Sequence, residues 1–417
     1  MSPTGNSKVL IVSYLFPPLN GPGTQHPTWF YRFLRDYGFE TYALSSSVYY
    51  AMSVGPPVPR DPRVLRTPDN PRFERLFYHL YHAELWAQLR FETWEPGFVW
   101  GALSGISAAT ELLKRERFTA IVSVSPSVAS HWTALRIKRR FPYLKWIADF
   151  QDPFLGNPFK RESAAAPLAR RLERAIFSAA DCLSANTDTV MEMWQQRYPE
   201  YREKMTVTWG GYDPEENITA LPIGSGQTPV LKYVGALYDG RHPTALLQSL
   251  ERLVAQGRLR PGDLITEFFG SLKFGELEPL VADLERKGFV RLSPTYVPRP
   301  EALEAAARTH YSLLLDIAGS GDAVLQVPAK LFDQIRMGRP ILAFTAPNSP
   351  TQRILEQSGI PHVCIGPQAP PEEVDAGILR LLQMPADPQP ASAWFRETFD
   401  ARRLAGLMAA RIRGERV

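Results

Sequence analysis

Residues 313–347 constrain the fold more than any other stretch, because two short apolar runs flank a helix that has clear end signals. The runs are residues 313–317, which are apolar apart from Asp316, and residues 340–344. Runs of this length between turn signals are typical of parallel strands that are covered on both faces. Pro328 stands at the start of the expected helix and Gly338 just past its end, which is the usual order of these residues. The stretch therefore predicts a strand, a turn, a helix and a second strand of a parallel α/β sheet.

Two charged residues in the first turns of this helix predict a ligand. Lys330 and Asp333 are three residues apart, so they project from one side of the helix. A cation beside the exposed N–H groups of a helix start suits a diphosphate, and a carboxylate one turn further on suits a pair of ribose hydroxyls. The spacing therefore favours a nucleotide diphosphate.

The residues from Lys330 to Pro340 resemble the donor-binding motif of the GT-B glycosyltransferases, in particular the family 4 group that uses nucleotide sugars. That motif has a Lys, an apolar pair, an acidic residue, an apolar helix and a Gly-Lys/Arg-Pro turn, and here Gly338-Arg339-Pro340 forms the turn. The resemblance implies an α/β protein of GT-B fold. Two Rossmann-like parallel-sheet domains would face each other across a cleft, and a C-terminal helix would cross back to the first domain.

The expected domains follow from this resemblance and from the length of the chain, since 417 residues suffice for two cores. Residues 1–212 are expected to form a Rossmann-like acceptor domain, and residues 229–395 a Rossmann-like donor domain. The polar residues 213–228, which contain Pro and Gly, are the expected linker. Residues 396–417 are the expected helix that packs back on the first domain.

The apolar residues argue against a membrane-spanning helix, because no apolar run approaches the ~18–20 residues that a bilayer requires. The run from Val9 to Phe16 is short and lacks a cleavage-site pattern, so we interpret it as a first strand and not as a signal peptide. Cys182 and Cys364 lie far apart and form no CxxC pair, which favours a reduced cytosol and no structural metal. We therefore expect a cytoplasmic protein, with attachment to the inner face of a membrane left open.

Charged and aromatic residues in the first half leave two interpretations open. Residues 1–210 carry 25 Lys and Arg against 19 Asp and Glu, which suits an anionic acceptor or membrane, or simply a solvated surface. Residues 73–100 place many aromatic side chains at helical spacing. This stripe is either core and interdomain packing or a peripheral membrane contact, in which Arg72, Arg75 and Arg90 would meet lipid headgroups. The small basic excess and the lack of a recognised motif argue against nucleic-acid binding.

A glycine loop follows the first expected strand. Residues 16–23 contain Gly21 and Gly23 and precede a helix that we expect from about residue 25 to 37. A strand, a glycine loop and a helix start make an anion-binding corner, or else a tight turn without a ligand. The resemblance implies that this loop faces the donor phosphates, which makes both glycines candidate donor-site residues.

Two later strand ends in the first half resemble a subgroup of the family. That subgroup has Ser/Thr-Pro-Pro-x-Ser-x-His and then Asp-Phe-Arg-Asp-Pro-Trp. This chain keeps the frame in residues 125–131 and 149–154. It departs from the pattern with Ser127 for the second Pro, Gln151 for the Arg and Phe154 for the Trp. The change at Gln151 removes any ion pair or phosphate contact that the Arg would make.

Asp152 and His131 are the candidate catalytic residues in this region. Ser125, Asp149 and Asp152 follow expected strands, and ligands of open α/β sheets bind in the crevice outside the carboxyl ends of the strands. Asp152 can orient or deprotonate an acceptor hydroxyl, or it can cap the loop that follows its strand. His131 is either catalytic or a helix histidine with a structural partner.

The second half supplies the remaining candidate donor ligands. Gly235 ends an expected strand, and Arg241 precedes a helix, where a guanidinium is a good diphosphate ligand. No Lys follows Arg241 at the spacing usual in the family, so Arg241 and Lys330 would share the role of the cation pair. The resemblance places Tyr296 where family members hold the nucleobase, and it places Gly321 in a Gly-Ser-Gly loop near the phosphates and the sugar.

The chemistry of sugar transfer fits this set of residues, because charge builds on the leaving diphosphate and fixed cations can stabilise it. The chain has no Asp-x-Asp triplet, so we expect neither a metal nor a permanently bound cofactor. Members of the family generally retain the anomeric configuration. The first Glu of the common Glu-x7-Glu pattern is replaced here by Leu325, so a retaining mechanism is implied by the resemblance alone.

The leading hypothesis is a glycosyltransferase that moves a sugar from a UDP-, GDP- or dTDP-linked donor to an acceptor hydroxyl. The acceptor would be a glycan, a lipid-linked molecule or a small molecule, in the assembly of bacterial surface polysaccharide or glycolipid. One alternative is an inactive GT-B protein that binds sugar nucleotides, which Leu325 and Gln151 favour. Another is a sugar-nucleotide epimerase, although this chain lacks recognisable counterparts of the carboxylate and His positions on which that family relies.

Overall fold

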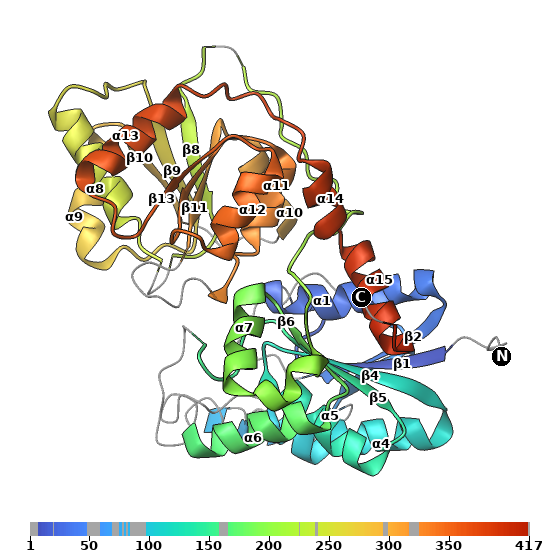
Figure 1. Cartoon of the computed structure of the whole chain (residues 1–417). Coiled ribbons are helices and arrows are strands. Elements are labelled where there is room, and N and C mark those ends of the chain that lie inside the picture. Colours follow the sequence, from blue (N-terminus) through green and yellow to red (C-terminus); the bar gives the residue numbers. More distant parts are fainter. Residues whose placement is uncertain are drawn as a thin grey trace. The chain divides into compact units, whose positions relative to one another are not determined.

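The computed structural model describes residues 7–19, 21–47, 59–68, 75–76, 79–80, 82–83, 97–157, 166–224, 226–237, 241–294, 299–316 and 325–415. The chain divides into two compact units (Figure 1). The first comprises Met1–Asp213 with Phe399–Val417, and the second comprises Pro214–Thr398. Tyr296, Gly321 and most of the aromatic stretch 73–100 lie outside the described residues.

The first unit is built on a seven-stranded sheet in which all strands are parallel, as predicted. The strand order is β3-β2-β1-β4-β5-β6-β7. The strands are β1 (Ser7–Val12), β2 (Phe39–Ser46), β3 (Val64–Thr67), β4 (Phe118–Val124), β5 (Lys145–Phe150), β6 (Cys182–Ala185) and β7 (Met205–Val207).

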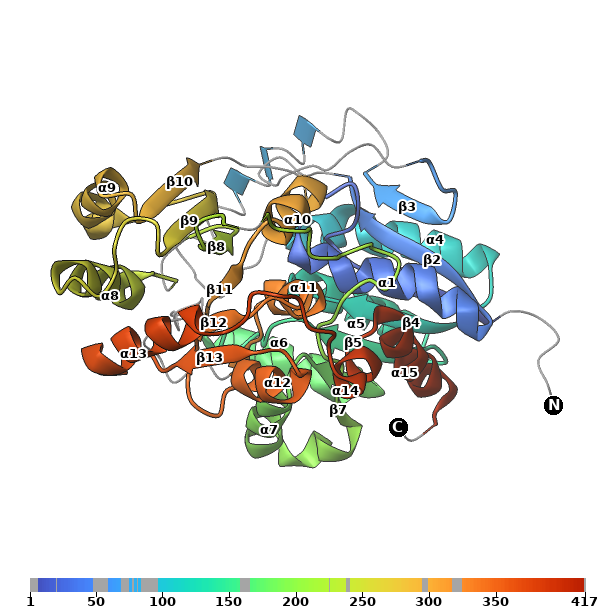
Figure 2. The ribbon, with the colours of Figure 1, turned by 90° about the horizontal axis from the view of Figure 1, so that it is seen from above.

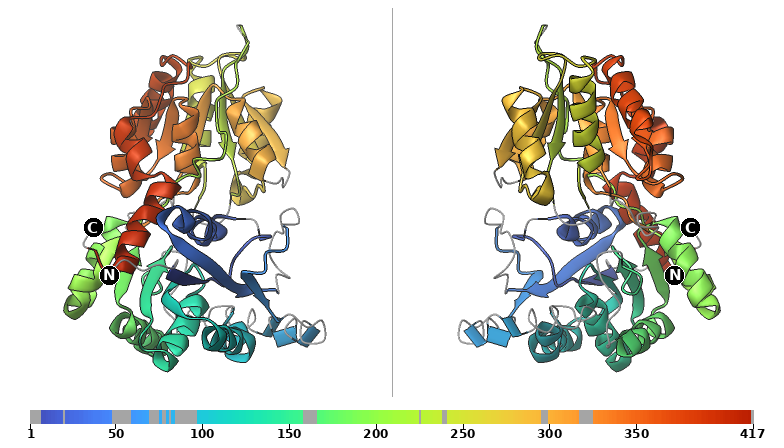
Figure 3. Two further views of the ribbon diagram at one scale, coloured as in Figure 1. Left: turned by 90° about the vertical axis from the view of Figure 1, so that its right-hand side faces the viewer. Right: turned by 90° about the vertical axis from the view of Figure 1, so that its left-hand side faces the viewer.

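Helices cover both faces of this sheet (Figure 3). One face carries α1 and α15, which pack against each other, and the opposite face carries α4, α5 and α6 (Figure 1). The helices of this unit are α1 (Gln25–Phe33), α3 (Phe98–Trp100), α4 (Ile106–Arg115), α5 (Val128–Arg140), α6 (Ala166–Ala179), α7 (Asp188–Arg197) and α15 (Ala401–Arg413).

The C-terminal helix α15 is part of the core of the first unit. Met408 and Ile412 of α15 belong to one buried cluster with Val9 and Ile11 of β1 and Phe30 of α1. Arg411 fastens the same helix to the end of the sheet, because its guanidinium donates to the Val207 carbonyl at 2.7 Å. The segment farthest along the chain therefore completes the unit that the first strand begins.

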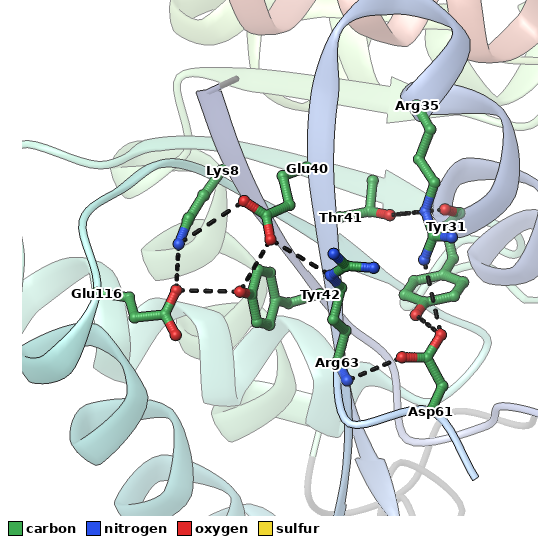
Figure 4. A network of polar contacts seen from close by, with 9 residues as sticks. All are labelled: Lys8, Tyr31, Arg35, Glu40, Thr41, Tyr42, Asp61, Arg63 and Glu116. Atoms are coloured by element: carbon green, nitrogen blue, oxygen red, sulfur yellow. Dashed lines mark hydrogen bonds and ion pairs between the residues drawn. The ribbon is translucent and has the colours of Figure 1, made fainter. Parts of the chain in front are cut away.

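One strand of this sheet was not expected from the sequence. Residues 45–72 are rich in Pro, Ser and Arg, a composition typical of a loop, but β2 extends to Ser46 and β3 pairs with it in parallel, with Val64 beside Ala43. β3 has only four residues and no alternating pattern, so tertiary contacts hold it (Figure 4). Just before it, Asp61 accepts a hydrogen bond from Tyr31 and Arg63 donates to Glu40.

The second unit has a six-stranded sheet, again entirely parallel, in the order β10-β9-β8-β11-β12-β13. Its helices form two groups, one of α8, α9 and α13 and one of α10, α11 and α12 (Figures 1 and 2). The strands are β8 (Val230–Val234), β9 (Ile265–Gly270), β10 (Val290–Pro294), β11 (Tyr311–Leu315), β12 (Ile341–Phe344) and β13 (His362–Ile365). The helices are α8 (Thr244–Ala255), α9 (Glu278–Arg286), α10 (Arg299–Ala307), α11 (Lys330–Met337), α12 (Pro350–Ser358), α13 (Pro371–Leu382) and α14 (Ala393–Thr398).

The predicted strand–helix–strand unit is present as β11, α11 and β12, and the two strands are parallel neighbours. Gly338 ends α11 in the left-handed region, with φ of 75°, and its N–H caps the carbonyls of Gln334 and Ile335. Within the described ranges, no helix is long and apolar enough to cross a membrane.

The place of α15 in the first core predicts the effect of truncating one of its leucines. Leu404 of α15 is 1% exposed, whereas Leu168 of α6 is 62% exposed. We expect Leu404→Ala to lower the free energy of unfolding by about 2–5 kcal/mol, because it leaves a cavity. Leu168→Ala should change it by less than about 0.5 kcal/mol. Urea unfolding of both variants measures the difference, and equal effects would contradict the placement of α15.

Candidate nucleotide-binding site

Lys330 is the first residue of α11, and its buried amino group has no hydrogen-bond partner among the residues that the structure describes. The Nζ atom lies 3.7 Å from the centre of the Tyr233 ring, on β8. It also lies at the backbone of Gly235, where a Cβ atom would come within 2.9 Å of Nζ. A buried amino group without an acceptor is costly unless a ligand supplies one. Lys330 therefore marks a place for an anion at the end of β8.

Two glycines open the backbone around this amino group. Gly235 directly follows β8 and Gly270 is the last residue of β9, with φ values of 134° and 136°. A Cβ atom on Gly270 would collide with the carbonyl oxygen of Gly235. The two strand ends approach this closely only because neither residue carries a side chain.

Arg241 brings a second positive charge to the same place. It precedes α8, and its charge, together with burial, holds the pKa of Lys330 well below the ordinary range of a lysine. The contact with the Tyr233 ring acts in the opposite direction, because an aromatic face favours the charged ammonium. Lys330 thus lies beside Gly235 and close enough to Arg241 to feel its charge, and a shared cation pair for a diphosphate stays a prediction.

Asp333 lies one turn along α11 and is engaged by an arginine that the sequence analysis did not single out. Arg299 donates to both carboxylate oxygens, Nη1 to Oδ2 and Nη2 to Oδ1, at 3.0 Å each. Burial raises the pKa of Asp333, and the charge of Arg299 opposes that shift. Arg299 also binds Glu216, at 2.7 Å between Nη2 and Oε2. No local pattern indicates this cluster, because its three residues come from distant parts of the chain.

The glycine loop of the first unit leads into α1, as predicted. A Cβ atom on Gly23 would lie 2.8 Å from Cδ of Pro126, so this glycine permits close contact with the turn before α5. Gly21 has φ of 154° and open space around its Cα. Thr24 closes the loop by donating from Oγ1 to the Gly21 carbonyl at 2.8 Å.

His131 is fully buried between α5 and the sheet. Its Nδ1 lies 2.8 Å from Oγ of Ser123, and its ring packs on Phe150 with 3.9 Å between the ring centres. Burial lowers its pKa to about 3, so the imidazole is neutral at physiological pH. The structure therefore assigns His131 a packing role in this arrangement, and a catalytic role for it stays a prediction.

Asp152 lies half-buried in the turn after β5, beside polar strand ends that the structure brings together. The backbone N–H of Gln151 donates to Oγ of Ser125 at 2.9 Å, and its side chain donates to Asp149 at 3.1 Å. Asp149 also pairs with His26 of α1, at 3.0 Å between Oδ2 and Nδ1. His26 lies in the first turn of α1, and no pattern in the sequence indicates this pair, because its two residues lie 123 positions apart.

Among the described residues, no group of three or more His, Cys, Asp or Glu is placed to hold a metal ion.

Comparison with solved structures identifies the fold. The chain superimposes on the lipopolysaccharide outer core galactosyltransferase WaaB with a TM-score of 0.58 and 12% identity, over 98% of this chain and 99% of that one. It superimposes on the UDP-forming α,α-trehalose-phosphate synthase from Burkholderia vietnamiensis with a TM-score of 0.60 and 12% identity, over 99% and 100%. For Anabaena HepE in complex with UDP the TM-score is 0.54 at 11% identity, over 97% of this chain and 95% of that one.

These structural neighbours are GT-B glycosyltransferases, and the two all-parallel sheets of this chain match them. The chain therefore has the GT-B fold that the motif at Lys330 predicted. No protein-family model matches the sequence, and a comparison with curated protein sequences finds no match.

The close approach of Gly235 and Gly270 predicts that a side chain at residue 270 is harmful. Gly270→Ala should lower the melting temperature more than Gly257→Ala, although both residues have positive φ, because only Gly270 has backbone in the path of a Cβ atom. Thermal unfolding of both variants measures this difference. Equal decreases in melting temperature would show that the ends of β8 and β9 can move apart without cost, which would contradict the prediction.

Proposed function

We propose that this protein is a glycosyltransferase that transfers a sugar from a nucleotide-diphosphate donor to an acceptor hydroxyl. The observation that carries the proposal is the buried Lys330 amino group, which lies beside Gly235 at the end of β8 and has no hydrogen-bond partner in the described part of the chain. The fold supports the same class, since its neighbours include a galactosyltransferase and a HepE structure that holds UDP.

The second unit would bind the donor. Lys330 and Arg241 would neutralise the diphosphate, and Gly235 would let the phosphates approach the backbone. Asp333 would accept hydrogen bonds from the ribose hydroxyls. When the anomeric C–O bond breaks, its electron pair remains on the diphosphate, and the two fixed cations stabilise that charge without a metal.

The first unit would bind the acceptor. Its hydroxyl oxygen forms the new bond to the anomeric carbon and loses its proton, for which Asp152 is the proposed acceptor or orienting group. We propose a lipid-linked or polysaccharide acceptor, with retention of configuration and with contact to the inner face of a membrane through this unit. The resemblance of the motifs and the basic first half of the sequence support these finer points.

A binding screen tests the donor site. One of the UDP-, GDP- or dTDP-linked sugars should raise the melting temperature, and a concentration of about 100-fold above Kd corresponds to about 2.7 kcal/mol of stabilisation. EDTA should leave this stabilisation unchanged. Lys330→Ala should abolish it, whereas Lys287→Ala, which removes a half-exposed lysine paired with Asp283 in the same unit, should retain it.

Release of free sugar from the stabilising donor would further support intact chemistry. If none of the three nucleotide classes stabilises the wild-type protein, the proposed donor site is wrong.

The environment of Lys330 predicts that donor binding takes up protons. Burial and Arg241 lower the pKa of Lys330 in the free protein, and a bound diphosphate favours the ammonium and raises that pKa. Between the two pKa values, binding therefore adds a proton to the amino group. Calorimetric titration with UDP in buffers of different ionisation enthalpy measures this uptake. Wild-type protein that binds UDP with no proton uptake at any pH would contradict the assignment.

A further inference from the structure

Arg299 connects two carboxylates from distant parts of the second unit. Arg299 is the first residue of α10. It donates to Glu216 from Nε to Oε1 at 3.0 Å and from Nη2 to Oε2 at 2.7 Å. It donates to Asp333 from Nη1 and Nη2, at 3.0 Å each. We call these three residues the Arg299 bridge. Its two ends are bidentate, which fixes the guanidinium in one plane.

The Arg299 bridge is shielded from water at the end that faces α11. The Asp333 side chain is 11% exposed, against 29% for Arg299 and 35% for Glu216. Burial alone would raise the pKa of Asp333, and Arg299 opposes this. The two carboxylates in turn raise the pKa of Arg299. The bridge therefore places the Asp333 carboxyl group beside a guanidinium at a buried position.

Glu216 is itself held in place by α11. Arg336, three residues after Asp333, donates from Nη2 to the backbone carbonyl of Glu216 at 2.9 Å. The segment around Glu216 thus contacts α11 both directly and through Arg299. Asp333 therefore has an orientation that is determined by more than its own rotamer preference.

The hydrogen-bonding capacity of Asp333 is only partly used by this arrangement. A carboxylate offers about four acceptor positions, two on each oxygen. Within the described ranges, Arg299 is the donor to these oxygens, with one bond to each, which leaves one position on each oxygen for a ligand. Two remaining positions on one locked carboxylate match the two adjacent hydroxyls of a ribose, and Lys330 stands one turn earlier for the phosphates.

We propose that Arg299 is a positioning residue, which holds the Asp333 carboxylate in the orientation that accepts both ribose hydroxyls, and that Glu216 holds Arg299 in turn. This inference rests on the proposed function, since it assumes that a nucleotide occupies the site. It predicts that Arg299, without touching the ribose, sets how strongly the protein prefers a ribonucleotide to its deoxy analogue.

The test compares, by calorimetry, the dissociation constants of UDP and 2′-deoxy-UDP, or of GDP and 2′-deoxy-GDP if GDP is the nucleotide that stabilises the protein. A protein that binds only dTDP, which lacks the 2′-hydroxyl, overturns the inference. Wild type should bind UDP about ten-fold more tightly, as expected for one hydrogen bond to a charged group. Asp333→Asn and Arg299→Gln should each bring this ratio close to one. The double variant should lose no more than either single variant, because both act on the same interaction.

Arg252→Gln is the matched control. In the same unit, Arg252 of α8 forms an ion pair with Asp375 of α13, with 2.7 Å between Nη2 and Oδ1. The Arg252 side chain is 31% exposed and the Asp375 side chain 7%, so this ion pair is about as buried as that of Arg299 with Asp333. It should lower the melting temperature but keep the preference for UDP. If Arg299→Gln does not fold, Arg299→Lys keeps the charge without the fork and should still reduce the preference.

Three outcomes separate the inference from the proposed function. If Asp333→Asn removes the preference while both Arg299 variants keep it, Arg299 is only a structural brace and the inference is overturned. If wild type binds UDP without any preference over the deoxy analogue, the inference is also overturned, but the donor site stands. If wild type binds no nucleoside diphosphate, both the inference and the proposed function fail.

Discussion

The burial of the Lys330 amino group against Tyr233 is the interaction on which the rest of the site depends. An amino group removed from water without an acceptor destabilises the free protein, and a nearby guanidinium makes the ammonium form still less favourable. A diphosphate would compensate both costs at once. The glycines that end β8 and β9 leave the backbone open beside this amino group, so the local fold favours an anion there and little else.

The placement of individual residues, and not the net charge of the second half of the chain, makes this site positive. Residues 211–417 hold 22 Lys and Arg against 24 Asp and Glu, so the half of the chain that contains the site is slightly acidic. Parallel strand ends and helix starts nevertheless bring Lys330 and Arg241 together, and the Arg299 bridge places a carboxylate one turn away. An anionic end and a hydroxyl-bearing end of one ligand would each meet a suitable group, which is the arrangement that a sugar nucleotide requires.

The sequence predicted the parts of this fold that have local signals. The strand–helix–strand unit around α11 was readable because its apolar runs, Pro328 and Gly338 lie within one short stretch. Gly235 and Arg241 were singled out through the family resemblance, and the binding role of both, like that of Lys330, stays a prediction. β3, the pair of His26 with Asp149, and the contacts of Arg299 were not readable. Their partners lie 21 to 123 residues apart along the chain, and such contacts leave no periodicity in a single sequence.

A crystal structure of the protein grown with the nucleoside diphosphate that stabilises it would test the central claim most directly. We expect a phosphate oxygen within hydrogen-bond distance of Lys330 Nζ, beside Gly235, and contacts between the ribose hydroxyls and Asp333. A nucleotide bound elsewhere, with Lys330 still packed on Tyr233 and no phosphate beside it, would show that Lys330 does not form the donor site.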